Sequence, residues 1–161
     1  MKILCCLDGT NTEAVSRAAR MFAGERAPAL GLLTVVDVGP RKDIDRIRER
    51  FWRPPMHREP VIQEMLAAEK EASEAILQAG LQCLPEAESL LRQGHPELEI
   101  VNTAADWAAD VILICSRADP GAPPSLGPRS VGHVARFVLD HAPCPVLLVR
   151  PRAGGLFPIK G

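Results

Sequence analysis

The sequence predicts an α/β fold, in which a doubly wound, parallel five-stranded sheet carries helices on both faces. The first observation is that five short apolar runs alternate with segments of helical periodicity, an order typical of βαβ units. The second is that most of these runs are continuously apolar, as in parallel strands buried on both faces. A length of 161 residues favours one domain. We expect it to span residues 1–150, with a mobile, Gly- and Pro-rich tail at 151–161.

The first 36 residues predict one βαβ unit, whose crossover should be right-handed. Residues 2–7 are a short apolar run, which we expect to be a core strand rather than a signal peptide because an acidic residue follows at once. Thr10 or Asn11 can cap the next helix, which should end near Gly24. The apolar stripe of this helix consists of Ala14, Val15, Ala18, Ala19 and Phe22. Residues 30–36 predict the second buried strand.

A basic connection follows at residues 38–60, where seven basic and four acidic side chains give a local charge of +3. Three apolar residues at helical spacing predict a short amphipathic helix over 41–51. Two interpretations stay open. The segment is either a solvated connection with one apolar anchor, or a lid or partner-binding flap that uses Phe51 and Trp52. The acidic residues dilute the charge too much to favour nucleic-acid binding.

The middle of the chain predicts a long helix, an edge strand and a second helix. Residues 61–80 have the clearest helical pattern, and Gly80 should end that helix. Its expected buried face consists of Ile62, Met65, Leu66, Ala72, Ile76 and Leu77. Residues 87–92 predict a more polar strand, and therefore one nearer the sheet edge. Residues 93–97 should turn into the next helix. The expected inner face of that helix consists of Leu98, Val101, Ala105 and Ala108.

The last third predicts two more apolar strands, at residues 111–115 and 146–149. A loop rich in Gly, Pro, Ser and Arg and then a helix separate them, and Pro143 should terminate that helix. The side chains expected to line the helix are Val134, Phe137, Val138 and His141. A loop that feeds a helix N-terminus is a common way to build an anion site, because the backbone N–H groups and the helix dipole point the same way.

Composition excludes several functional classes. The net charge of −1 gives no general attraction to nucleic acid, and no apolar run approaches the roughly 20 residues that a membrane helix needs. The five cysteines are odd in number and form no CxxC pair, so we expect neither a disulfide framework nor a zinc knuckle, and a cytoplasmic location. The sequence has no GxSxG, HExxH or Walker motif, so we expect no catalytic residues and no metal site.

Several segments, taken in order, resemble the universal stress protein family over nearly the whole chain. GHVARFVLDHAPCPVLLVR, at residues 132–150, is similar to the closing helix and strand of that family, and ILCCLDGT to its first strand and turn. LTVV, at residues 33–36, and the Gly-His-Pro turn at 94–96 are similar to further family elements. The resemblance implies the strand order 3-2-1-4-5 of the adenine nucleotide alpha hydrolase-like fold. It also implies a crevice beyond Leu7 and Cys115, where strands one and four diverge.

The resemblance implies adenine-nucleotide binding in that crevice. An aspartate after strand one and a backbone group near the end of strand two would hold adenosine, and a loop of form Gly-x2-Gly-x9-Gly-Ser/Thr would hold the phosphates. Carried over with the side-chain donors of the loop, the candidate site residues are Asp8, Val35, Cys115, Ser116, Arg117, Ala118, Arg129, Ser130, Gly132 and His133. ATP or another adenine nucleotide, with magnesium, would be the ligand.

The loop departs from the family pattern. The first two glycine positions fall on Cys115 and Ala118, and the Ser/Thr position falls on His133. Thirteen residues, four of them proline, separate Ala118 from Gly132. Each proline removes a backbone donor, and a side chain at a glycine position can block the close approach of phosphate. The phosphate site is therefore altered, and it is either degenerate or adapted.

We therefore expect a non-catalytic regulatory module of the stress response with an altered adenine-nucleotide crevice. The alternative is an ATP- or AMP-binding protein with slow nucleotide hydrolysis, and a third hypothesis is binding of another small ligand beneath Phe51 and Trp52. The resemblance also implies a homodimer, because family members commonly pair the last strand across a dimer axis, and a bare apolar edge favours pairing. The expected dimer strand consists of Pro145, Val146, Leu147, Leu148 and Val149. The sequence identifies no other protein partner.

Overall fold

The computed structural model describes residues 1–22, 27–37, 59–116 and 131–150. Several expectations fall outside these ranges: the helix end at Gly24, the basic connection with Phe51 and Trp52, and the tail at 151–161. Four of the candidate site residues are also outside the described residues: Arg117, Ala118, Arg129 and Ser130.

The described residues form a five-stranded sheet of order β3-β2-β1-β4-β5, in which every neighbouring pair is parallel. This confirms the predicted fold class and strand order. The strands are β1 Lys2–Cys6, β2 Ala29–Asp37, β3 Glu88–Gly94, β4 Val111–Cys115 and β5 Val146–Val149. The bounds of β4 and β5 match the prediction, and the polar strand β3 lies at an edge as expected.

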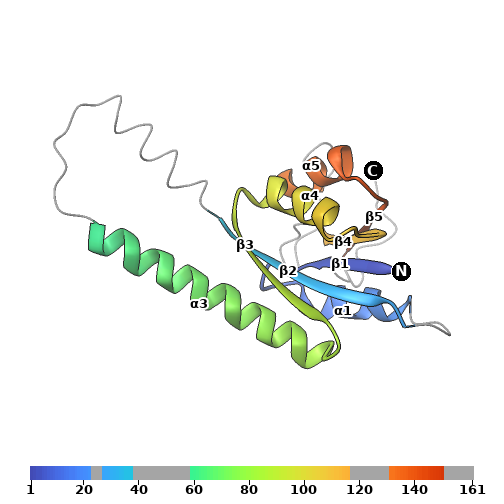
Figure 1. Cartoon of the computed structure of the whole chain (residues 1–161), viewed down its shortest axis with the longest axis horizontal. Helices are drawn as coiled ribbons and strands as arrows, with labels where there is room; N and C mark the ends of the chain where they lie inside the picture. Colours follow the sequence, from blue (N-terminus) through green and yellow to red (C-terminus); the bar gives the residue numbers. More distant parts are fainter. Residues whose placement is uncertain (23–26, 38–58, 117–130, 151–161) are drawn as a thin grey trace, which may run out of the picture.

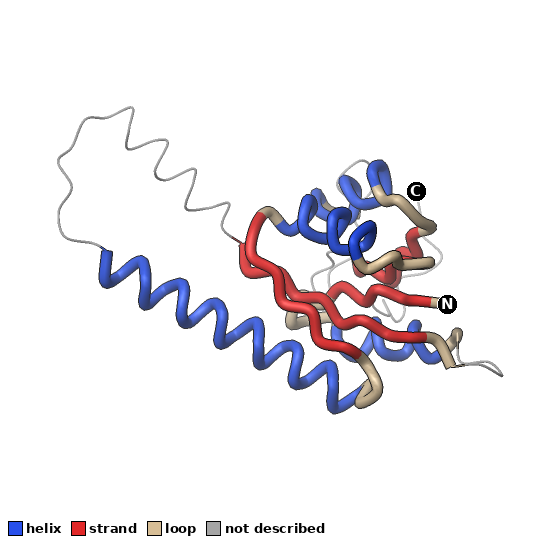
Figure 2. Tube along the Cα trace, viewed as in Figure 1, coloured by secondary structure: helices blue, strands red, loops and turns tan. Residues whose placement is uncertain are grey.

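Helices cover both faces of the sheet, as Figures 1 and 2 show. They are α1 Thr12–Arg20, α3 Glu59–Cys83, α4 Pro96–Asp106 and α5 His133–His141. Helices α1 and α3 lie on one face, and α4 and α5 lie on the other (Figure 1). No helix among the described residues is both long enough and apolar enough to cross a membrane.

Strand β1 lies at the centre and divides the core in two. Ile3, Cys5 and Leu7 pack into the core beneath α1 and α3, whereas Leu4 and Cys6 pack into the core beneath α4 and α5. Successive strand residues point to opposite faces, so the two adjacent cysteines enter different cores. All five cysteines are free.

Helix α3 differs from its prediction at Gly80. The glycine does not end the helix, which continues to Cys83. A Cβ atom built at Gly80 would lie 2.8 Å from Cδ1 of Leu7 and 2.9 Å from Cδ1 of Leu32. The glycine is therefore in the helix because α3 approaches the sheet closely there. Ala72 is exposed, and Ser73 is buried instead. The prediction that Ala72 belongs to the buried face was therefore wrong.

The predicted inner face of α4 was wrong except for Val101, which is half-buried and packs against the core. Leu98 is 46% exposed, and Ala105 and Ala108 are exposed as well. The residues that pack against the sheet are Ile100, Thr103 and Ala104. In α5, His141 is exposed rather than part of the inner face, and it stacks on Phe137 with ring centroids 4.1 Å apart.

A Schellman motif ends α4. The N–H of Ala109 donates to the carbonyl of Ala104 at 2.9 Å, and the N–H of Ala108 to that of Ala105 at 3.1 Å. The motif places Ala108 at φ +52°, which is the left-handed region that favours glycine.

Replacing Ala108 by glycine is expected to raise the free energy of unfolding by about 1 kcal/mol, because glycine adopts this conformation without steric cost. Urea unfolding followed by circular dichroism measures the change. The same substitution at the exposed helical position Ala75 should lower stability by about 1 kcal/mol. Equal effects at the two positions would contradict the left-handed conformation assigned to Ala108.

Candidate functional site

The switch point of the sheet, where the family resemblance implies a crevice, lies at the carboxyl ends of β1 and β4. The ladder between these strands ends with Cys5 opposite Leu113. Beyond it, the N–H of Leu7 donates to the carbonyl of Leu33 in β2 at 2.8 Å, and the N–H of Ser116 to that of Val149 in β5 at 3.1 Å. The two strands thus turn to different neighbours, and the sheet divides at the switch point where open α/β sheets bind ligands.

The turn after β1 is closed by Asp8 and Asn11. The Asp8 Oδ1 atom accepts hydrogen bonds from the backbone N–H and the hydroxyl of Thr10, both at 2.9 Å. The N–H of Asp8 donates to Oδ1 of Asn11 at 3.1 Å. Gly9 lies at φ +87° between them. One carboxylate oxygen of Asp8 therefore shapes the turn, and no described residue is hydrogen-bonded to the other.

Asn11 is the site residue that sequence reasoning missed. Asn11 is only 4% exposed, and its Nδ2 atom donates a hydrogen bond to the carbonyl of Cys6 at 3.1 Å. It also lies near the Cys115 side chain of β4, and this interaction lowers the pKa of that thiol. The sequence suggested a helix cap, and Asn11 does occupy the N-cap position of α1, but its side chain makes no cap hydrogen bond. It joins β1, the Asp8 turn and β4 instead.

The Cys115 thiol lies where the family loop has its first glycine. The pKa of this thiol is raised to about 11, first by burial and then by the negative charge of Asp8, while the Asn11 side chain opposes the shift. Burial also raises the pKa of Cys5 to about 12 and that of Cys6. These thiols are protonated at neutral pH, and a protonated thiol is a poor nucleophile. Next to Cys115, Ser116 is buried at the end of β4.

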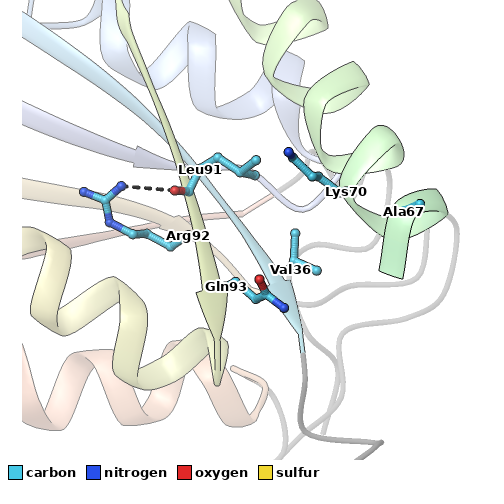
Figure 3. A pocket seen from close by; sticks show the side chains of 6 residues that line it. All are labelled: Val36, Ala67, Lys70, Leu91, Arg92 and Gln93. Carbon is cyan, nitrogen blue, oxygen red and sulfur yellow. Dashed lines mark hydrogen bonds between the residues drawn. The ribbon is translucent and has the colours of Figure 1, made fainter. Parts of the chain in front are cut away.

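Val35 and a neighbouring pocket lie on the other side of β1. Val35 is in β2, two strands from Cys115, and two strand spacings are about 10 Å. Between α3 and the ends of β2 and β3 is a pocket of about 370 Å³, within the usual range for small-molecule sites. It is lined by Val36, Ala67, Lys70, Leu91, Arg92 and Gln93. In Figure 3 the Arg92 side chain points away from Lys70, and it donates to the carbonyl of Leu91 at 3.0 Å.

Gly132 and His133 begin α5. Gly132 is the N-cap at φ +87° and ψ 158°, a conformation essentially restricted to glycine. As a glycine, the N-cap residue has no side chain with which to accept hydrogen bonds from the first N–H groups of the helix. The Nε2 atom of His133 lies 3.7 Å from Oε1 of Glu97, at the start of α4.

The structure therefore brings Asp8, Cys115 and Ser116 together at the crevice, with Asn11 beside them. Gly132 and His133 lie at the N-terminus of α5. Within the described ranges, no group of three or more His, Cys, Asp or Glu side chains is arranged to hold a metal ion.

The match to known proteins covers the whole sheet. The model of the universal stress protein family matches residues 1–150. A Thermus aquaticus universal stress protein, described by its place in the 3′ region of QAH/OAS sulfhydrylase, is 33% identical over 148 residues. That alignment covers 92% of this chain and 97% of the relative. The chain belongs to the universal stress protein family.

Solved structures agree with this fold. The universal stress protein UspA from Lactobacillus plantarum matches with a TM-score of 0.63 and 24% identity, over 93% of this chain and 97% of that one. A family protein from Arabidopsis thaliana with AMP bound matches with a TM-score of 0.61 and 15% identity, over 95% and 93%. A universal stress protein in complex with cAMP matches with a TM-score of 0.53 and 19% identity, over 94% and 98%. At these identities the likeness shows the fold.

Proposed function

We propose that this universal stress protein is a non-catalytic, homodimeric binding module of the stress response, whose altered crevice holds an adenine nucleotide. The observation that carries the proposal is the start of α5. Gly132 adopts a positive φ that glycine alone reaches easily, and as the N-cap residue it offers the helix N-terminus no side-chain acceptor. Asp8 stands at the end of β1, where the family resemblance places the contact with adenosine, and one of its oxygens has no hydrogen-bond partner among the described residues.

Two further observations support the ligand class and the absence of catalysis. Structural neighbours of this fold contain AMP or cAMP. The thiol closest to the Asp8 turn is held protonated by burial, which makes it unsuited to attack a phosphorus atom. ATP with magnesium is a second ligand to compare with AMP, and slow hydrolysis of ATP is the alternative function.

Calorimetric titration with AMP, and with ATP and magnesium, tests the proposal after copurified nucleotide has been removed. We expect micromolar binding that weakens about tenfold or more in Asp8→Ala, since a hydrogen bond to a charged group contributes about 1.5–3 kcal/mol. Gly132→Ala should weaken binding similarly, because alanine strains the turn. Asp106→Ala, an exposed change at the far end of α4, is the control.

The absence of heat with every nucleotide would contradict the proposed ligand and would leave a degenerate crevice. Release of ADP from ATP, measured with the same protein and lost in Asp8→Ala, would favour the hydrolase alternative over a non-catalytic module.

The dimer is proposed to form through β5. This strand pairs with β4 alone among the described strands, and its Leu147 is 39% exposed. An open apolar strand edge favours pairing with a second copy.

We expect a dimer at micromolar concentration in light scattering coupled to gel filtration. Leu147→Lys should shift the protein toward the monomer, because it places a charge on the apolar surface. Leu98→Lys changes an equally exposed leucine on α4 and should leave the dimer intact. A monomeric wild-type protein would contradict this assignment.

A further inference from the structure

The first turns of α4 and α5 differ in their acidic residues. Helix α4 has two acidic residues in its first turn, Glu97 and Glu99, whereas α5 has none. The two helices lie side by side on one face of the sheet (Figure 1). The Glu97 side chain, 20% exposed, reaches to 3.7 Å from the His133 side chain, which is 79% exposed. A carboxylate of α4 thus stands beside the first residue of α5.

Glu99 does not share this position. A Cβ atom built at Gly94 would lie 2.5 Å from Oε1 of Glu99. The carboxylate of Glu99 therefore packs against the turn between β3 and α4. Of the two acids in the first turn of α4, Glu97 is the one that lies at the start of α5.

We propose that Glu97 is a specificity-determining residue of the nucleotide crevice, which disfavours ligands with several negative charges and so selects an adenine nucleotide with one phosphate. This inference rests on the proposed function, because it concerns the phosphate end of the same crevice. The resemblance places the phosphates next to Gly132 and His133, and Glu97 contacts His133 directly.

The reason is electrostatic. The α5 N-terminus attracts an anion through its dipole and its first N–H groups, and the carboxylate of Glu97 repels the same anion. His133 adds at most one positive charge, and the neighbouring Glu97 carboxylate offsets that charge. The repulsion grows with the charge of the ligand, whereas the contacts to adenosine do not change. At physiological ionic strength, charges within a Debye length of about 8 Å still interact.

The test compares dissociation constants of adenosine, AMP and ATP without magnesium for the wild type and for Glu97→Gln. The substitution keeps the shape of the side chain and removes its charge. We expect affinity for ATP to rise about fivefold or more and affinity for AMP to rise about twofold, with adenosine unchanged, as surface charges modulate anion binding. The difference should shrink in high salt. Glu99→Gln is the matched control in the same turn and should change none of the three constants.

Two results would overturn the inference in distinguishable ways. If AMP binds and the ratio of the ATP and AMP constants is the same in the wild type and in Glu97→Gln, Glu97 does not determine specificity, and the proposed function stands. If the wild type and Glu97→Gln bind none of the three ligands, the crevice takes no adenine nucleotide, and both proposals fall together. Circular dichroism of each variant confirms that it is folded.

Discussion

Replacing Gly80 by valine should lower the free energy of unfolding by about 2–3 kcal/mol, because it forces extra methyl groups into a packed core. The space for the new Cβ atom is already occupied by the Cδ1 atoms of Leu7 and Leu32, at 2.8 and 2.9 Å. Both leucines are buried, so neither can move aside without displacing its own neighbours. The gain that comes from removing glycine from a helix is smaller, at most about 1 kcal/mol.

Ala79→Val is the matched control for this prediction. Ala79 is the preceding residue of α3 and is exposed, so valine there adds only the small helix-propensity cost of a β-branched side chain, about 0.5 kcal/mol. Urea unfolding of the two variants measures the difference. If Gly80→Val were as stable as Ala79→Val, α3 would not approach the sheet as closely as the structure places it.

Replacing Asn11 by alanine should lower the free energy of unfolding by about 2–3 kcal/mol and also weaken nucleotide binding. The substitution leaves the N–H of Asp8 and the carbonyl of Cys6 without their side-chain partners. Each buried polar group left unpaired costs about 1–3 kcal/mol, and some of this is recovered when water enters. Because Asn11 also contacts Cys115, the turn that carries Asp8 should lose its fixed position relative to β4.

Thr10→Ala separates this role from a general effect on the turn. It removes one exposed hydroxyl hydrogen bond to Asp8 and keeps the backbone one, so we expect a loss below about 1 kcal/mol. Asn11→Asp keeps the acceptor but puts a second carboxylate near Asp8, and should be no more stable than Asn11→Ala. Equal stability of Asn11→Ala and Thr10→Ala would show that Asn11 does not organise the crevice.

Apart from the more polar β3, the strands could be predicted well because each is a largely apolar run with a polar boundary. Strand β4 begins directly after Asp110, and β5 lies between Pro145 and a charged residue. These flanking residues marked where the strands begin and end, so the bounds could be predicted. Their order came from the family resemblance and not from the runs themselves. A parallel sheet can be threaded in several orders from the same strands.

The helix faces were harder, because short helices with many alanines have more than one apolar stripe. In α4 the stripe through Leu98 and Val101 competes with the one through Ile100 and Ala104, and the sheet selects the second. Thr103 is buried with it although it is polar. The structural role of a glycine in a helical segment was ambiguous in the same way. At Gly80 it marks a close helix-to-sheet contact rather than a helix end, and the local sequence alone does not distinguish the two.

Part of the candidate site could be predicted and part could not. Asp8 and Gly132 were assigned as candidate site residues through the family resemblance, and the structure places one just after β1 and the other at the start of α5. Asn11 could not be assigned as a site residue, because its proximity to Cys115 joins segments far apart in the sequence. The ion pair between Glu97 and His133 also needs the packing of two helices, which no local pattern reveals.

The adjacent cysteines of β1 make the two halves of the core chemically distinguishable. Cys5 and Cys6 are neighbours in the chain, but each is buried beneath a different pair of helices. A thiol reagent reaches a buried sulfur only when the structure over it opens. The labelling rates of these two sulfurs therefore report separately on the opening of each helix layer. A single unfolding curve averages the stability of the two helix layers. The labelling rates of the two cysteines, measured in one peptide, would show which layer opens first.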